Sequence, residues 1–273
     1  MKLKVLVDNN TIIDSYFYGE PGVSYYIEDG DSKILFDVGY SDLFINNAKK
    51  MDVDIGDIDH VVISHGHNDH TGGLVPLMNF LGSSDQTKPL IVAHPEAFFH
   101  KECDGNPIGS KIGIDEVGYC FNLSLTREPL WITEKIVFLG EIDRQNSFEN
   151  IDPIGQYRKD DRLYDDYLKD DSAIVYRSCQ GLVIITGCSH SGICNIIEHA
   201  KKVCKEEKIA AVIGGFHLIN PSEEQLRGTL DYFAKTKIDL IYPCHCTGLK
   251  FKIELSKIAN IEDVGVGLTL NYS

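Results

Sequence analysis

The chain has 273 residues, of which 43% are hydrophobic and 25% are charged, and its formal net charge is −15. This composition is typical of a soluble globular protein, and the length allows one large domain or two small ones. The negative charge argues against nonspecific binding to nucleic acid or anionic membranes, because both need a basic face on the protein. Since we find no linker and no internal repeat, we expect a single domain over residues 1–273.

The N-terminus alternates as a strand does and reaches Asp8-Asn9-Asn10 too early for a signal peptide. No apolar run has the length of a membrane span. We therefore expect a cytoplasmic protein that binds neither a membrane nor nucleic acid, and we leave open a homodimer. The eight cysteines lack the spacing of a small disulfide-bonded domain, so we expect mostly free thiols.

The first forty residues predict three strands, over residues 3–7, 23–28 and 33–37, and the last two are joined by a hairpin signal. Asp37 lies at the end of the third strand. A carboxylate there can orient a metal-binding histidine by accepting a hydrogen bond from its ring. The alternative is that Asp37 caps the helix predicted from about residue 41 to 50.

The apolar run 61–63 predicts a buried strand, and apolar residues at helical spacing over 74–81 predict a helix. The turn between them holds four side chains that can bind a metal: His65, His67, Asp69 and His70. His65 and His67 face the same way if this turn is extended, and the other two can face a second point. Imidazole and carboxylate are ligands of zinc and iron, so the turn predicts part of a site for two metals. The alternative is a histidine-rich surface loop.

Residues 101–171 predict an irregular insertion, broken by glycines, with strands only near 118–123 and 135–139. A long insertion of this kind is commonly functional, so it is either a lid or specificity segment or a solvated loop. Arg144 is the residue of interest there, because a guanidinium suits bidentate binding of phosphate or carboxylate.

The second half repeats the pattern of an apolar strand followed by a polar turn. Strands over 172–176 and 181–186 lead to a turn with Cys188 and His190, and then to a helix over about 193–203. The free backbone N–H groups at the start of this helix, near Ser191, predict an anion site. Two further strands, 209–213 and 239–242, lead to His217 and His245, and residues 262–268 predict a last strand. If these strands share one direction, their polar ends converge on one edge.

The Phe36-Asp37-Val38-Gly39 strand end, the HxHxDH motif of residues 65–70 and the later strand-end histidines resemble the metallo-β-lactamase fold. The resemblance implies an α+β protein, an αββα four-layer sandwich, with a metal site that is often binuclear at one edge. Two departures stand out. The Pro-Gly-His-Thr segment of many relatives is missing, and Cys188 stands where a metal-bridging aspartate usually lies.

The resemblance further implies the ligand sets. His190 would complete a site with His65 and His67, and His245 would join Asp69 and His70. These sets would hold two divalent ions, zinc by preference and manganese or iron as alternatives. Asp69 and His217 would act in catalysis. His217 would contact substrate, although a role as a metal ligand is the alternative. Cys188 would pack beside the site, although a thiolate ligand is an alternative.

Within this superfamily the stretches 65–74, 187–193, 214–218 and 243–248 are similar to the group typified by a dihydropterin–ribofuranosylaminobenzene phosphate synthase. Such enzymes join a dihydropterin diphosphate to an aminobenzene ribofuranosyl phosphate and release diphosphate. This similarity implies a metal-dependent enzyme acting on a phosphorylated or diphosphorylated small molecule, with Arg144 and Ser191 binding phosphate. The alternatives are a hydrolase of lactones, thioesters or phosphoesters, and a non-catalytic or redox metal-binding protein.

Overall fold

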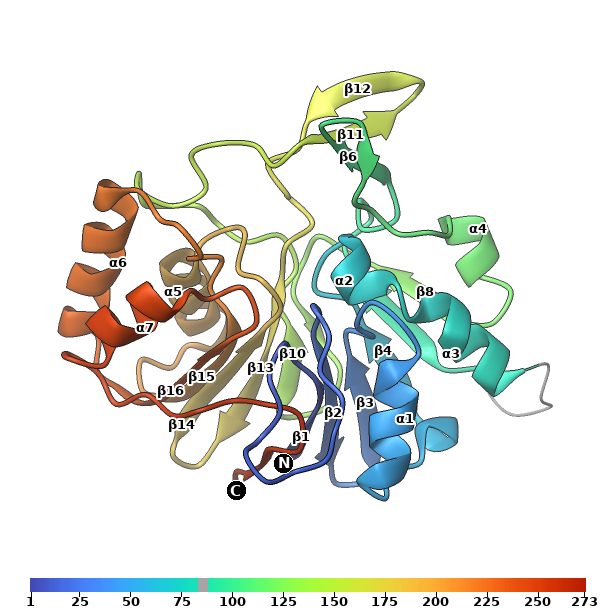
Figure 1. Cartoon of the computed structure of the whole chain (residues 1–273), viewed down its shortest axis with the longest axis horizontal. Coiled ribbons are helices and arrows are strands. Elements are labelled where there is room, and N and C mark those ends of the chain that lie inside the picture. Colours follow the sequence, from blue (N-terminus) through green and yellow to red (C-terminus); the bar gives the residue numbers. More distant parts are fainter. Residues whose placement is uncertain (83–87) are drawn as a thin grey trace.

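The computed structural model describes residues 1–82 and 88–273. Two sheets pack face to face in the middle of the molecule (Figure 1). The first sheet has the order β17-β1-β2-β3-β4-β5-β8. Its strands are β1 (Lys2–Val7), β2 (Ser24–Asp29), β3 (Ser32–Phe36), β4 (His60–Val62), β5 (Leu90–Ala93), β8 (Asn122–Leu125) and β17 (Thr269–Asn271).

The second sheet has the order β16-β15-β14-β13-β10-β9. Its strands are β9 (Leu130–Trp131), β10 (Ile136–Phe138), β13 (Ala173–Ser178), β14 (Gly181–Thr186), β15 (Ile209–Gly215) and β16 (Ile238–Cys244). Both sheets are mixed, because each has a parallel part, β3-β4-β5-β8 or β14-β15-β16, beside antiparallel strands.

Helices cover the outer faces of the two sheets (Figure 1). On the first sheet these are α1 (Leu43–Lys50), the 3-10 helix η1 (Ile55–Asp57), α2 (Asn68–Thr71), α3 (Leu74–Leu81) and α4 (Ile114–Val117); on the second they are α5 (Ile193–Cys204), α6 (Glu223–Lys235) and α7 (Leu249–Leu255). One apolar cluster fills the space between the sheets, and one more lies under each helix layer. The predicted αββα sandwich is therefore confirmed.

Strand β14 shows why this sequence forms an inner layer. Its six residues are all buried. Val183 and Ile185 lie in the cluster between the sheets, whereas Leu182 and Ile184 lie in the cluster under the helices. Since successive side chains of a strand point to opposite faces, a strand covered on both faces needs an unbroken apolar run.

Residues 101–171 contain more regular structure than the sequence predicts. Strands β8, β9 and β10 belong to the two main sheets, and four short strands form a small sheet of order β12-β11-β6-β7. The latter are β6 (His100–Cys103), β7 (Asn106–Pro107), β11 (Gln156–Lys159) and β12 (Arg162–Asp165). Most of their side chains are exposed or half-buried, so they show no apolar alternation, and the prediction of an irregular insertion was wrong for this reason.

The C-terminal part differs from the prediction in two places. The last strand is β17, which pairs with β1, and it begins after the predicted range 262–268. Gly267, which lies in the irregular segment just before β17, has a φ of 102°, a value that favours glycine. Helix α7 was not predicted. Among the helices of the described residues, none is long and apolar enough to cross a membrane.

Candidate metal centre

The polar strand ends converge on one edge of the sandwich, as predicted. Strands β3 and β4 run parallel in one sheet, and β14, β15 and β16 run parallel in the other. Their C-terminal ends carry Asp37, the turn 64–70, the turn 187–192, His217 and His245. Side chains from both halves of the chain therefore meet between the two sheets.

His65, His67 and His190 form what we call the three-histidine group. One ring nitrogen from each lies within 4.8 Å of the others, and all three residues are buried. Nε2 of His65, Nε2 of His67 and both ring nitrogens of His190 have no hydrogen-bond partner. Buried polar atoms without partners are costly, and neutral imidazoles at this spacing are the ligands that zinc prefers. The group therefore fits a metal ion.

Burial determines the charge of this group. It lowers the pKa of His65 and of His190 well below 6.5, and it lowers the pKa of His67 to about 4. At neutral pH all three imidazoles are therefore uncharged, which is the form that binds metals.

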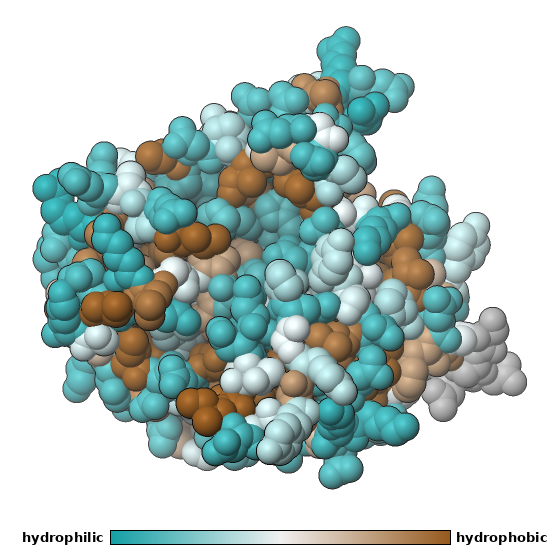
Figure 2. All heavy atoms as spheres, in the orientation of Figure 1, coloured by the Kyte–Doolittle hydropathy of each residue, from teal (hydrophilic) through white to brown (hydrophobic). Residues whose placement is uncertain are grey.

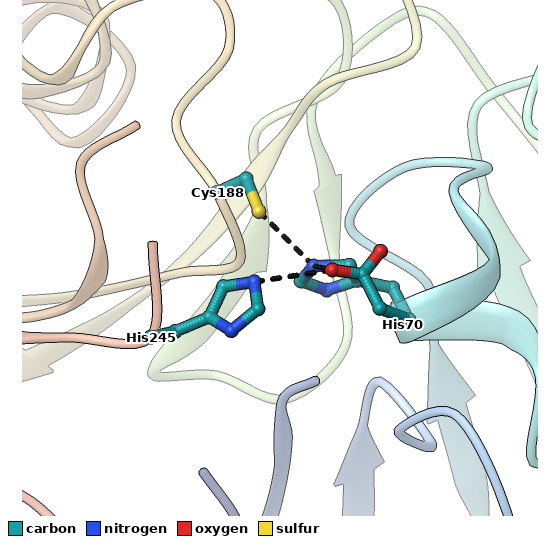
Figure 3. A group of neighbouring side chains, drawn as sticks. His70, Cys188 and His245 are labelled. Carbon is teal, nitrogen blue, oxygen red and sulfur yellow. Dashed lines mark hydrogen bonds and ion pairs between the residues drawn. The ribbon is translucent and has the colours of Figure 1, made fainter. Parts of the chain in front are cut away.

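Asp69, His70, Cys188 and His245 form what we call the mixed group, and their ligand atoms also lie within 4.8 Å of one another. Figure 3 shows Cys188 and His245 reaching toward His70 from separate loops. The Cys188 Sγ lies 3.1 Å from His70 Nε2, and the His245 Nε2 lies 3.3 Å from an Asp69 carboxylate oxygen. Nitrogen, oxygen and sulfur donors together fit a second divalent ion.

The mixed group carries charges and protons. Burial acts to lower the pKa of His70, but Asp69 and Asp37 outweigh it and raise that pKa to about 9. Burial likewise opposes ionisation of Asp69, yet the neighbouring His70 and His245 hold the pKa of this carboxyl well below its usual range. Burial raises the pKa of the Cys188 thiol well above 9.

Asp37 orients residues of both groups. One of its oxygens accepts hydrogen bonds from His70 Nδ1 at 2.7 Å and from the Ser64 hydroxyl at 2.6 Å. Because that hydroxyl donates to Asp37, its oxygen accepts from His65 Nδ1 at 3.0 Å. Nε2 of each histidine is thereby left facing the centre. Asp37 thus holds His70 directly, as predicted for this strand end, and holds His65 through Ser64.

His245 is held by two residues that the sequence analysis did not identify. Its backbone N–H donates to Asp8 at 3.0 Å, and its Nδ1 lies 2.8 Å from the side-chain oxygen of Asn9. His245 has a φ of 49°, a strained value for a residue other than glycine, and these contacts help to hold it. A signal was present, since Asp8 and Asn9 follow the first strand as Asp37 follows the third.

Cys188 lies among the candidate metal ligands, whereas the sequence predicted that it packs beside them. It belongs to the mixed group and also to a set with His190 and His217, whose ligand atoms lie within 4.8 Å. Its sulfur is therefore placed between the two groups, which favours a ligand over a packing residue. The ring centroid of His217 lies 4.3 Å from that of His190, and its Nδ1 is buried without a partner. His217 as a substrate contact stays a prediction.

Arg144 does not reach this centre. Its guanidinium donates to the Asn150 side chain at 2.5 Å and to the Leu168 carbonyl at 2.8 Å. It lines a different cavity, with Arg127 and Lys202. The structure therefore does not bring Arg144 to the candidate metal centre, because its side chain links Asn150 to Leu168. Binding of a substrate phosphate by Arg144 stays a prediction.

The backbone N–H groups at the helix start near Ser191 bind carboxylates of the protein itself. The Ser191 N–H and hydroxyl both donate to Asp171. The N–H groups of Cys194 and Asn195 donate to the buried Glu149 carboxylate at 2.9 and 3.0 Å. In the structure, carboxylates of the chain therefore occupy the helix start where a substrate phosphate was predicted, and phosphate binding at Ser191 stays a prediction.

A cavity of about 610 Å³ opens over the candidate metal ligands. The candidate ligands in its lining are His67, Asp69, Cys188, His190 and His245, with His217 beside them. The apolar part of the lining comprises Pro21, Tyr40, Ile108, Ile154 and Ile219. Among the described residues that line this cavity, none is lysine or arginine.

Comparison with known proteins agrees with this geometry. The metallo-beta-lactamase superfamily matches residues 18–245. An uncharacterized protein of Methanocaldococcus jannaschii is 33% identical over 94% of this chain and 95% of its own length. The 7,8-dihydropterin-6-methyl-4-(beta-D-ribofuranosyl)-aminobenzene-5'-phosphate synthase of the same organism is 32% identical over 92% of this chain and 88% of its own length.

A solved structure, that of Tm1679, described as a metal-dependent hydrolase of the beta-lactamase superfamily, is 29% identical. It covers 100% of this chain and 99% of its own, with a TM-score of 0.86. The family match and the similarity to the two archaeal proteins extend over most of the chain, and the fold agrees. The chain therefore belongs to the metallo-β-lactamase superfamily.

Proposed function

We propose that the protein is a two-metal enzyme that acts on a phosphorylated or diphosphorylated small molecule. We further propose a transfer reaction like that of the synthase to which it is similar. The observation that carries this proposal is the pair of adjacent ligand groups, joined by Cys188, beneath a single cavity. Paired ions of this kind suit reactions at phosphate, where both the attacking and the departing oxygens need stabilisation.

The three-histidine group would hold one ion, and Asp69, His70 and His245 would hold the other, with Cys188 between them. Zinc is the preferred metal, because it accepts nitrogen, oxygen and thiolate ligands together. When bound, the ions would supply Lewis acidity to the phosphate oxygens. Since no lysine or arginine occurs among the described lining residues, the ions would also balance the charge of the substrate.

Two side chains would act on the substrate directly. His217 lies beside His190 with a buried, unpartnered ring nitrogen, so it can hydrogen-bond a substrate oxygen. The Asp69 side chain remains 27% exposed toward the cavity and stays ionised, so it can accept a hydrogen bond from an attacking group and orient it. Both roles agree with those implied by the sequence.

The test is an assay of the metal-loaded protein with a dihydropterin diphosphate and an aminobenzene ribofuranosyl phosphate. We expect metal-dependent release of diphosphate that requires both substrates and stops on chelation. The His217→Ala variant should lose most of this activity while keeping its metal content. The exposed His100 provides a matched control, since His100→Ala should have no effect. Full metal content without diphosphate release would contradict the transfer reaction.

A hydrolase is the second candidate, and the 29% identity to the metal-dependent hydrolase structure favours it. The same protein should then be assayed with lactones, thioesters and phosphoesters in the absence of any acceptor. Metal-dependent turnover of one of these, with no diphosphate release in the two-substrate assay, would establish the hydrolase. No turnover together with redox-active iron would instead favour a redox role.

A further inference from the structure

We propose that the small sheet β12-β11-β6-β7 is a specificity wall, which selects substrates that carry a flat apolar group, such as an aryl ring, next to their metal-bound end. This inference rests on the proposed function and names the substrate class of the same cavity. It assigns to residues of the segment 101–171 a role that the metal ligands do not explain.

Two of the five apolar residues that line the cavity flank strands of this wall. Ile108 follows strand β7 and Ile154 precedes strand β11, and both line the cavity together with Tyr40 and Ile219. Figure 1 shows the small sheet projecting above α2, the helix that carries Asp69 and His70. Figure 2 shows brown apolar side chains beside a hollow below this projection. The floor of the cavity is thus polar and its walls are apolar.

These apolar side chains are incompletely covered by the protein itself. Ile108 and Ile154 are half-buried, Tyr40 is 44% exposed and Ile219 is 55% exposed. Removing such surface from water is favourable, and a ligand that fills the cavity would do so. The described lining has no cationic side chain, although the Lys111 ammonium lies 4.6 Å from the centre of the Tyr40 ring. An uncharged group is therefore expected along the part of the cavity wall formed by Ile108, Ile154 and Ile219. A flat ring fits these requirements.

The wall is held rigidly against the metal-binding turn. Lys101 of β6 is buried, and its ammonium donates to Asp166 at 2.7 Å and to Asp170 at 2.9 Å. The other oxygen of Asp170 accepts from the Gly66 N–H, between His65 and His67, at 2.7 Å. A buried pair of this kind is costly to break, so the wall keeps its position relative to the ligands.

A second contact places Ile108 itself. The Asn68 N–H, one residue after His67, donates to the Ile108 carbonyl at 2.7 Å. His67 and Gly109 form an isolated bridge beside it. The distance between the apolar wall and the metal ligands is therefore set by backbone hydrogen bonds, as a specificity element requires.

The test compares phenylphosphonate with methylphosphonate, two ligands with the same metal-binding group and different substituents. Calorimetry with the zinc-loaded protein should show that phenylphosphonate binds about tenfold more tightly or better, because its ring covers apolar surface. The double variant Ile108→Ala/Ile154→Ala should lose most of this preference and keep its affinity for methylphosphonate. Leu163→Ala is the matched control, since Leu163 lies on β12 of the same sheet, is 43% exposed and is absent from the cavity lining.

The inference is overturned if the two phosphonates bind equally well, if the preference survives the double variant, or if Leu163→Ala reduces it as strongly. Failure of the proposed function has a different signature. In that case neither phosphonate binds in a zinc-dependent manner, and the inference fails with it. Circular dichroism of each variant verifies that the fold is intact.

Discussion

The three-histidine group and the mixed group lie side by side, yet they differ in charge and in bound protons at neutral pH. In the first, burial keeps His65, His67 and His190 uncharged, and their free nitrogens have no partner. In the second, His70 and Cys188 hold protons at neutral pH, and a charged Asp69 lies among them. The first group can therefore take up an ion as it stands, whereas the second must first release protons.

The difference arises from the surroundings of similar side chains. His65 and His70 are both buried and both contact the same hydrogen-bond network, but only His70 has two carboxylates, Asp37 and Asp69, beside its ring. Those charges outweigh burial for His70, and nothing comparable does so for His65. Two fully buried histidines thus differ in protonation because of the charges beside their rings.

The largest expected effect is the loss of a ligand from the three-histidine group. His190→Ala should remove the ion held there and lower activity by more than the about 100-fold that is typical for outer hydrogen-bond partners. Metal analysis and the diphosphate-release assay check this. His100→Ala, on the exposed side of the small sheet, should retain full metal and activity. Unchanged zinc content in His190→Ala would remove His190 from the ligand set.

Asp37→Asn should weaken both groups, because Asp37 contacts His70 directly and His65 through Ser64. We expect affinity for each ion to fall by about 10- to 100-fold. A zinc titration followed by calorimetry would show both binding steps shifted. A shift in only one binding step would show that Asp37 supports a single group of ligands.

The pH dependence should separate the groups. A raised pKa means a bound proton at pH 7, so an ion entering the mixed group must displace protons from His70, whose pKa is about 9, and from Cys188. Its affinity should therefore rise with pH through 9, and should keep rising above pH 9 because Cys188 still holds its proton there. The affinity of the three-histidine group should stay level down to about pH 5, since the pKa of His67 is about 4.

Calorimetry in buffers of different ionisation enthalpy measures these protons. We expect no net release for the first ion and release for the second, reduced by about one proton in Cys188→Ser. Cys103→Ser is the matched control, because Cys103 also lines the cavity but belongs to none of the candidate ligand groups. Equal proton release in both steps would show that the two groups do not differ in charge as described.

The smallest effect is expected for Asn9→Ala. Asn9 contacts only His245 among the candidate ligands, through a neutral amide at 2.8 Å. Its loss should weaken the second ion by about tenfold, at the low end of the range for such partners, and leave the first ion unchanged. A zinc titration in which the first step shifts instead would contradict the separation of the two groups.

The sequence alone indicated the turn 64–70 as a candidate metal site, and it determined the layered fold. Both depend on local signals: ligand residues at close spacing, apolar runs long enough for covered strands, and polar residues where those strands end. The same signals indicated His190, His217 and His245, because each follows an apolar strand. The sequence can predict these features because a strand end and the turn after it are formed by residues that are neighbours in the chain.

The tertiary structure decided what those residues meet. Arg144 and Ser191 have the right chemistry for phosphate, but in the structure they donate hydrogen bonds to Asn150 and Asp171. Asp8 and Asn9 reach His245 across more than 230 residues of chain. The small sheet escaped prediction because its exposed strands have no apolar period. Contacts between distant segments depend on how the two sheets pack, and a local sequence pattern does not predict this packing.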